Sequence, residues 1–135
     1  MKKTMMQTDG NWFGGVTLKD EQAPEQNNMA LHACLNPADV LANRRALATS
    51  LNCMAEDFVF ADQTHSANFH KVTASDKGRG ATDRATAIPD TDALYTSERG
   101  IVLGGFMADC VPVLLVNEPA GIAAVVHSGW QGTVK

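Results

Sequence analysis

Residues 101–128 read IVLGGFMADCVPVLLVNEPAGIAAVVHS, and this stretch decides the fold class. It holds three near-continuous apolar runs, at 101–107, 111–116 and 122–126, separated by short polar segments. A run that is apolar throughout, rather than alternating with polar residues, predicts a strand that is buried on both faces. We therefore expect a central sheet in the C-terminal half of the chain, covered by other layers.

The residues upstream of this stretch add a helix and shorter strands. Asn36 as a cap and Pro37 at the first helical position predict a helix that continues to about Asn52. Its polar, solvent-facing side is expected to carry Asn43, Arg44 and Arg45. Strand composition is found at 11–18, 58–61, 67–72 and 93–95. The class is mixed α and β.

Length and composition limit the function classes. The 135 residues fit one domain, 1–135, and the net charge of −4 leaves no basic field to bind nucleic acid. The apolar runs are too short for a membrane span, and the N-terminus has no signal-peptide pattern, which favours a cytoplasmic protein. Residues 73–89 are small and polar with two glycines, which predicts a mobile surface loop.

Three potential metal ligands lie at predicted strand ends or turns. Cys110 falls between two buried strands, His127 ends the last one, and His65 lies in the polar turn 63–66. A thiolate and two imidazoles suit zinc, and three protein ligands leave one position open for catalysis. Their spacing matches no local zinc motif, so only the fold could bring them together. The same atoms of Cys110 and His127 also allow a nucleophilic Cys/His pair of a hydrolase.

Six short motifs, in order, give the chain a family resemblance. They are Gly14-Gly15-Val16-Thr17, Asn43-Arg44, Gln63-Thr64-His65-Ser66, Asp92-Ala93-Leu94-Tyr95-Thr96, Ala108-Asp109-Cys110-Val111-Pro112-Val113-Leu114-Leu115 and His127-Ser128-Gly129-Trp130-Gln131-Gly132. Together they make the chain similar to the YfiH-type family. Its members are called laccase-domain (multicopper polyphenol oxidase) proteins or purine nucleoside phosphorylases.

The resemblance implies a fold and an activity. The fold would be α+β with mixed β-sheets covered by helices, distantly like the catalytic domain of the cytotoxic necrotising factors. The site would hold Zn²⁺ through His65, Cys110 and His127. The enzyme would cleave adenosine, inosine and thio-nucleosides with phosphate, and it would also deaminate adenosine. Zinc can acidify a water for that deamination.

Other residues receive roles from the same motifs. Asp109 would transfer a proton or support the metal site, alongside Cys110 and His127 as catalytic residues. Arg44 or the amides of the turn after His127 would hold phosphate. The substrate-binding set is Arg44, Asn43, His32, Gly129 and Gln131.

Departures from the family pattern keep alternatives open. Met107 replaces the usual Thr, and Gln131 replaces an Arg that would supply a fixed charge and a bidentate fork. One alternative is therefore a metal-binding or interaction protein of the same fold with weakened catalysis. Copper polyphenol oxidation is the third interpretation, and too few His ligands for several copper ions argue against it.

The chain is shorter than family members. The resemblance implies that it is the N-terminal part of the family unit, truncated at the C-terminus. We expect either a truncated piece of that unit, or a natural short form whose exposed strand edge is covered by a second copy in a homo-oligomer.

Overall fold

The computed structural model describes residues 3–5, 12–108 and 110–129. They form two compact units, Met1–Met54 and Ala55–Lys135. The single-domain organisation expected from the length stays a prediction. No helix in the described residues is long and apolar enough to cross a membrane.

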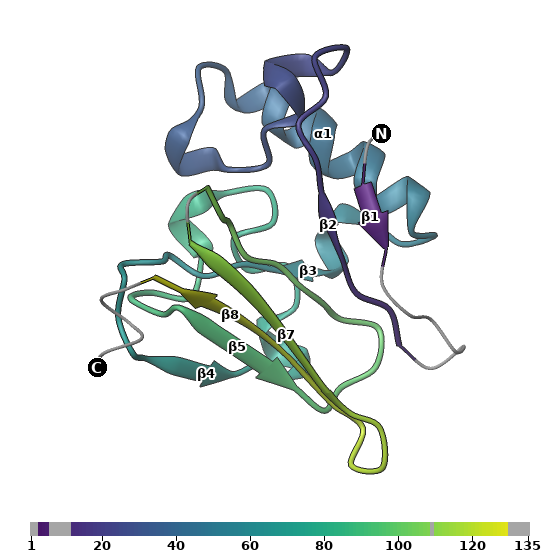
Figure 1. Ribbon diagram of the computed structural model, residues 1–135, viewed down its shortest axis with the longest axis vertical. Coiled ribbons are helices and arrows are strands. Elements are labelled where there is room, and N and C mark those ends of the chain that lie inside the picture. Colours follow the sequence, from purple (N-terminus) through teal and green to yellow (C-terminus); the bar gives the residue numbers. More distant parts are fainter. Residues whose placement is uncertain (1–2, 6–11, 109, 130–135) are drawn as a thin grey trace. The chain divides into compact units, whose positions relative to one another are not determined.

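The first unit contains a short hairpin-like pair of strands and the one long helix among the described residues. Strand β1 (Lys3–Met5) pairs antiparallel with β2 (Gly15–Thr17), so the strand expected at 11–18 is shorter than predicted. Helix α1 spans Pro37–Ser50, and the Asn36 side chain accepts a hydrogen bond from the Ala38 amide (Figure 1). The predicted helix start is therefore confirmed, and its end differs by two residues. Two 3₁₀ helices, η1 (Pro24–Asn27) and η2 (Leu31–Ala33), precede it.

The expected polar face of α1 is wrong at two positions. Asn43 and Arg44 are only 3% and 2% exposed and lie among the buried residues of the helix with Val40 and Ala48. The Asn43 amide donates to the carbonyls of Pro24 and Asn28, and Arg44 Nε donates to that of Met29. Polar side chains can be buried here because they satisfy loop carbonyls.

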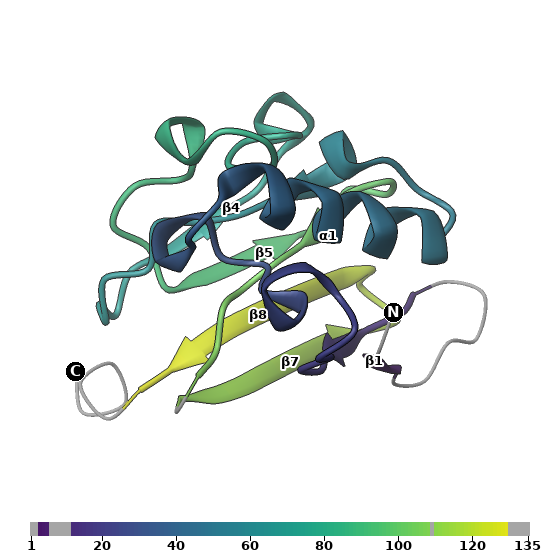
Figure 2. The same cartoon turned by 90° about the horizontal axis from the view of Figure 1, so that it is seen from above.

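A four-stranded mixed sheet organises the second unit. Its order is β4 (Phe69–Lys71), β5 (Ala93–Thr96), β8 (Ile122–Ser128) and β7 (Val111–Asn117), as Figures 1 and 2 show. Strands β4 and β5 are parallel, whereas β8 runs antiparallel to both of its neighbours. Strands β3 (Phe58–Val59) and β6 (Val102–Leu103) form a separate parallel pair. These strands confirm the α+β class with mixed sheets.

The run 101–107 forms only the short strand β6. The residue after it, Gly104, donates its amide to the Val59 carbonyl, and a Cβ at Gly104 would collide with the Phe60 ring. The Phe60 ring also stacks on Phe106, with 5.0 Å between centroids. The chain therefore leaves the sheet where an aromatic ring approaches its backbone.

One face of the four-stranded sheet forms the core. Leu94 of β5 and Val125 of β8 are opposite each other in the register, and the other buried members of the cluster are Val59, Ala61, Val72 and Ile88. Leu94 is 2% exposed and Val125 is 9% exposed. This face therefore holds the second unit together.

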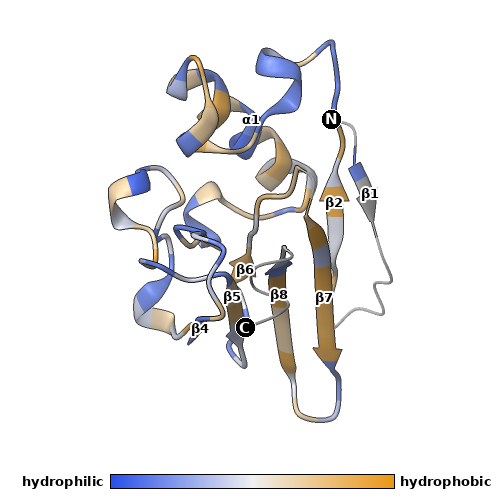
Figure 3. Cartoon of the chain, turned by 60° about the vertical axis from the view of Figure 1, so that its left-hand side comes forward, coloured by the Kyte–Doolittle hydropathy of each residue, from blue (hydrophilic) through white to orange (hydrophobic). Residues whose placement is uncertain are grey.

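The other face contradicts the expectation that the apolar strands are buried on both sides. The register places Leu115 of β7, Ala124 of β8 and Tyr95 of β5 in one row of this face. Leu115 is 55% exposed, Val111 58% and Phe69 of β4 72%. Figure 3 shows that β7 and β8 consist largely of hydrophobic residues. We call this side of the sheet the exposed apolar face, and its exposed large apolar residues are Phe69, Val111, Leu115 and Ile122.

The segment 73–89 is irregular but hydrogen-bonded to its surroundings. It contains the 3₁₀ helices η4 (Ala74–Asp76) and η5 (Arg84–Thr86). The Phe60 amide donates to the Arg79 carbonyl, and the Ile88 amide donates to the Phe60 carbonyl. Ala81 and Ile88 are 1% and 2% exposed. The predicted absence of long elements is observed, and the mobility of the segment stays a prediction.

Candidate metal centre

Three side chains from distant parts of the chain meet at one end of the four-stranded sheet. Cys110 directly precedes β7, His127 lies near the end of β8, and His65 lies in the loop before β4. One potential ligand atom from each of these residues lies within 4.8 Å of the other two. The fold thus brings together the His–Cys–His set that the sequence assigned to a metal.

The register of β7 and β8 places the cysteine opposite a glycine. Because Val111 pairs with Ser128, the next position along brings Cys110 to Gly129. A Cβ built on Gly129 would lie 3.1 Å from Cys110 Sγ and 3.6 Å from His65 Nδ1. Glycine therefore leaves a space between two potential ligands that any other side chain would occupy.

A buried carboxylate holds the two histidines. Asp92 lies just before β5 and is 6% exposed, and its Oδ2 is 2.7 Å from His127 Nδ1. The same oxygen accepts from the His65 amide at 3.1 Å. Asp92 Oδ1 accepts from the Thr64 amide and from the amide and hydroxyl of Ser66. One side chain therefore fixes the 64–66 turn and the His127 ring together.

These hydrogen bonds keep Asp92 ionised. Burial by itself raises the pKa of the Asp92 carboxyl, but the hydrogen bonds from His127, Ser66 and Thr64 outweigh it and lower the pKa to about 2. An ionised carboxylate can only accept hydrogen bonds, so His127 Nδ1 must donate. In a neutral ring that donates from Nδ1, Nε2 carries the lone pair that can bind a metal.

The donor set and the space fit a metal ion. His127 is buried, Cys110 is half-buried and His65 is exposed, so the cluster has a protected side and a solvent-facing side. The two imidazole rings have centroids 5.1 Å apart and are tilted by 56°. Three protein donors with access from solvent are typical of a catalytic zinc site. Among the described residues, this group is the one that could hold a metal ion.

The remaining assigned residues fall into three groups. Gly129 lies in the cluster. Asn43, Arg44 and His32 belong to the first unit, where His32 lies in η2 and is exposed. Burial lowers the pKa of Arg44 to about 10 while the nearby Cys34 opposes this change, so Arg44 remains a cation at neutral pH. Asp109 and Gln131 lie outside the described residues. The substrate-binding roles of these residues stay predictions.

Asp92 is the residue that the sequence reasoning missed. It is part of one of the six motifs, but its motif gave it no role. An aspartate directly before a predicted strand looks like an ordinary turn residue. Its role depends on the pairing of β5 with β8, through which the His127 amide donates to the Asp92 carbonyl at 2.8 Å.

The fold and the cluster define a class of protein, an α+β protein with a candidate three-ligand metal site at the end of a mixed sheet. The family model described as multi-copper polyphenol oxidoreductase laccase matches residues 13–135. The chain belongs to this family.

Characterised relatives carry enzyme names. The chain is 47% identical to purine nucleoside phosphorylase YlmD of Geobacillus stearothermophilus, over 78% of this chain and 39% of that protein. It is 38% identical to adenosine deaminase RL5 of an unknown prokaryotic organism, over 97% of this chain and 46% of that protein. The chain thus spans less than half the length of these relatives.

Solved structures agree with the fold. The crystal structure of YlmD from Geobacillus stearothermophilus superimposes with a TM-score of 0.78 at 47% identity, covering 79% of this chain and 40% of that one. The YfiH structure from Bacillus licheniformis gives the same TM-score at 39% identity, with the same coverage of each chain. The YfiH-like fold inferred from the motifs is therefore confirmed.

Proposed function

We propose that this chain forms the zinc centre of a purine nucleoside phosphorylase that acts with phosphate on adenosine, inosine and thio-nucleosides in the cytoplasm. The observation that carries this proposal is the convergence of His65, Cys110 and His127 within 4.8 Å. The names of the relatives support the reaction class. A cytoplasmic location suits the site, because a reducing environment keeps Cys110 available as a thiol.

Zinc is the metal that fits this donor set best. One thiolate and two neutral imidazoles are borderline-soft donors, and zinc accepts them in tetrahedral geometry. A bound zinc ion would act as a Lewis acid toward the substrate. Copper oxidation of phenols, which the family description suggests, needs more ligands than this group provides.

The chain's own residues would prepare the site. Asp92 orients His127, and Gly129 leaves room between Cys110 and His65. His65 lies on the exposed side, where a nucleoside would enter. Phosphate would attack the anomeric carbon of the sugar as the bond to the purine breaks, and backbone amides would hold the phosphate.

Adenosine deamination is the second proposed activity of the same site. The 38% identity to a protein named as an adenosine deaminase favours it. Water rather than phosphate would be the co-substrate, so omitting phosphate separates the two activities.

Elemental analysis combined with a nucleoside panel tests the proposal. The purified chain is expected to contain about one zinc per molecule and to release base from adenosine or inosine only with phosphate. Cys110→Ala should lose both the metal and the turnover, because the ligand set would fall to two. Cys53→Ala is the matched control and should keep both.

Two outcomes would contradict the proposal. Turnover that survives in Cys110→Ala would exclude the metal centre as the active site. Stoichiometric zinc without turnover would instead favour the alternative of a metal-binding protein with lost catalysis, and copper above one equivalent would favour the oxidase.

A further inference from the structure

We propose that Asp92 is the positioning residue of the metal centre, which selects the ligating tautomer of His127 and fixes the turn that presents His65. This inference rests on the proposed metal site and adds to it a residue with a defined task. Asp92 contacts both histidines directly, through His127 Nδ1 at 2.7 Å and the His65 amide at 3.1 Å.

The first part of the task is the tautomer of His127. A neutral imidazole carries its proton on one nitrogen, and only the other nitrogen can bind a metal. The Asp92 carboxylate accepts from Nδ1, so the proton stays there and Nε2 keeps its lone pair. A carboxylate behind a ligating histidine also orients its ring and raises its basicity.

The second part is the backbone of His65. This residue has a φ of +61°, in the left-handed region that residues with a side chain rarely adopt. The amides of Thr64, His65 and Ser66 all donate to the Asp92 carboxylate. Three successive amides on one carboxylate hold the turn in this conformation and so determine where His65 projects.

The variant Asp92→Asn cannot keep all of the hydrogen bonds that the carboxylate accepts. An amide side chain has one accepting oxygen and one donating nitrogen. If the amide nitrogen took the place of Oδ2, it would face two hydrogen-bond donors, His127 Nδ1 and the His65 amide. If it took the place of Oδ1, it would face three donors, the amides of Thr64 and Ser66 and the Ser66 hydroxyl. Facing His127, it would also require Nδ1 to accept, which moves the ring proton to Nε2.

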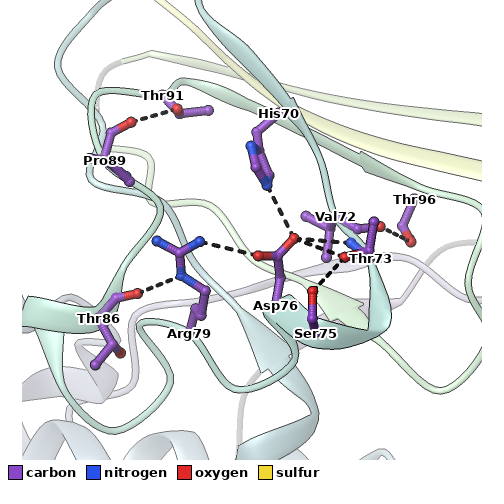
Figure 4. A network of polar contacts seen from close by, with 10 residues as sticks. All are labelled: His70, Val72, Thr73, Ser75, Asp76, Arg79, Thr86, Pro89, Thr91 and Thr96. Atoms are coloured by element: carbon purple, nitrogen blue, oxygen red, sulfur yellow. Dashed lines mark hydrogen bonds and ion pairs between the residues drawn. The ribbon is translucent and has the colours of Figure 1, made fainter.

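A second histidine–aspartate pair in the same unit provides the matched control. His70 Nε2 is 3.1 Å from Asp76 Oδ2, and Arg79 Nη1 is 3.1 Å from Asp76 Oδ1. Figure 4 shows these two side chains reaching Asp76, whose carboxylate also accepts from the Thr73 amide. Asp76 therefore shares with Asp92 a histidine partner and a buried setting, but it contacts none of the three potential ligands.

The test measures tautomer and zinc affinity rather than turnover. In the metal-free chain, ¹⁵N NMR is expected to show His127 protonated at Nδ1. Zinc competition with a chelator should show Asp92→Asn binding about 10- to 100-fold more weakly than the unsubstituted chain. Asp76→Asn should bind zinc within about twofold of the unsubstituted chain, even where it lowers stability, because it removes support from the fold but not from the ligands.

The outcomes separate this inference from the proposed function. A metal-free chain with His127 protonated at Nε2 would overturn the positioning role, and this measurement needs no variant to fold. Equal zinc affinity of Asp92→Asn and the unsubstituted chain would also overturn it. An unsubstituted chain that binds no zinc would contradict the proposed metal centre, while the tautomer measurement would still report on Asp92.

Discussion

The two faces of the four-stranded sheet both carry large apolar side chains, but these side chains differ in burial. On the covered face, Leu94 and Val125 are 2% and 9% exposed. On the exposed apolar face, Leu115 and Phe69 are 55% and 72% exposed. Apolar composition therefore predicts that a strand exists, but the segments that pack against the sheet decide which face is buried.

The covered face also supports the candidate metal centre. His127 follows Val125 by two positions, so it projects from the same face of β8. Asp92 lies two residues before Leu94, directly before the start of β5. The hydrogen-bonded pair of Asp92 and His127 thus continues the core toward the end of the sheet. A site that needs a fixed ring orientation benefits from this rigid support.

The largest expected effect comes from truncating the covered face. Leu94→Ala should lower the free energy of unfolding by about 3 kcal/mol, because it leaves a cavity in the core. Leu115→Ala on the exposed face is the control and should cost less than about 1 kcal/mol. Urea denaturation of both variants measures the difference.

Equal losses of unfolding free energy in Leu94→Ala and Leu115→Ala would contradict the difference in burial between the two faces. They would mean that Leu115 is buried in solution. Light scattering would then test whether a second copy of the chain covers the exposed apolar face, as the predicted homo-oligomer requires.

A smaller effect is expected where the covered face ends at the metal centre. Gly129→Ala places a methyl group 3.1 Å from Cys110 Sγ, so the sulfur must move. We expect zinc affinity to fall about tenfold, similar to the loss of an outer-shell contact, measured by chelator competition.

Gly105→Ala is the matched control for this change. The nearest atoms to its Cβ would be in the side chains of Met107, Gln63 and Val125, at 3.3 to 3.5 Å, and none of these is a potential ligand, so zinc affinity should be unchanged. If Gly129→Ala also binds zinc as tightly as the unsubstituted chain, the space at Gly129 is not required for the ligand arrangement.

The smallest effect concerns the Asp76 network beside β4. Burial raises the pKa of Asp76, but hydrogen bonds from Thr73, His70 and Arg79 together hold it below its ordinary value of 3.8. A lowered pKa in the folded state stabilises the fold above pH 3.8, and this contribution is lost as the pH falls through the lower folded value. Asp76→Asn should therefore cost about 1 kcal/mol at neutral pH and less in acid.

Unfolding curves between pH 7 and pH 2 measure this dependence. The difference between Asp76→Asn and the unsubstituted chain should shrink below pH 3.8. Glu98→Gln, at an exposed position, should follow the unsubstituted chain throughout. If the difference in unfolding free energy stayed constant with pH, the contribution of Asp76 would come from packing and not from its charge.

The sequence predicted secondary structure correctly where neighbouring residues determine the backbone conformation. Asn36 and Pro37 fixed the start of α1, because a cap and a proline act on the adjacent backbone. The buried positions of Arg44 and Asn43 were not predictable, because they depend on carbonyls of residues 24–29 that approach the helix only in the fold.

The sequence by itself determined the α+β class, the family and the candidate ligands His65, Cys110 and His127, because these follow from local pattern and motif order. Only the tertiary structure decided that the three ligands meet, that Asp92 holds two of them, and that one apolar face of the sheet is exposed. The reason is physical. Strand register and side-chain packing bring together residues that are far apart in the sequence. A local sequence pattern does not show which distant residue a side chain will contact.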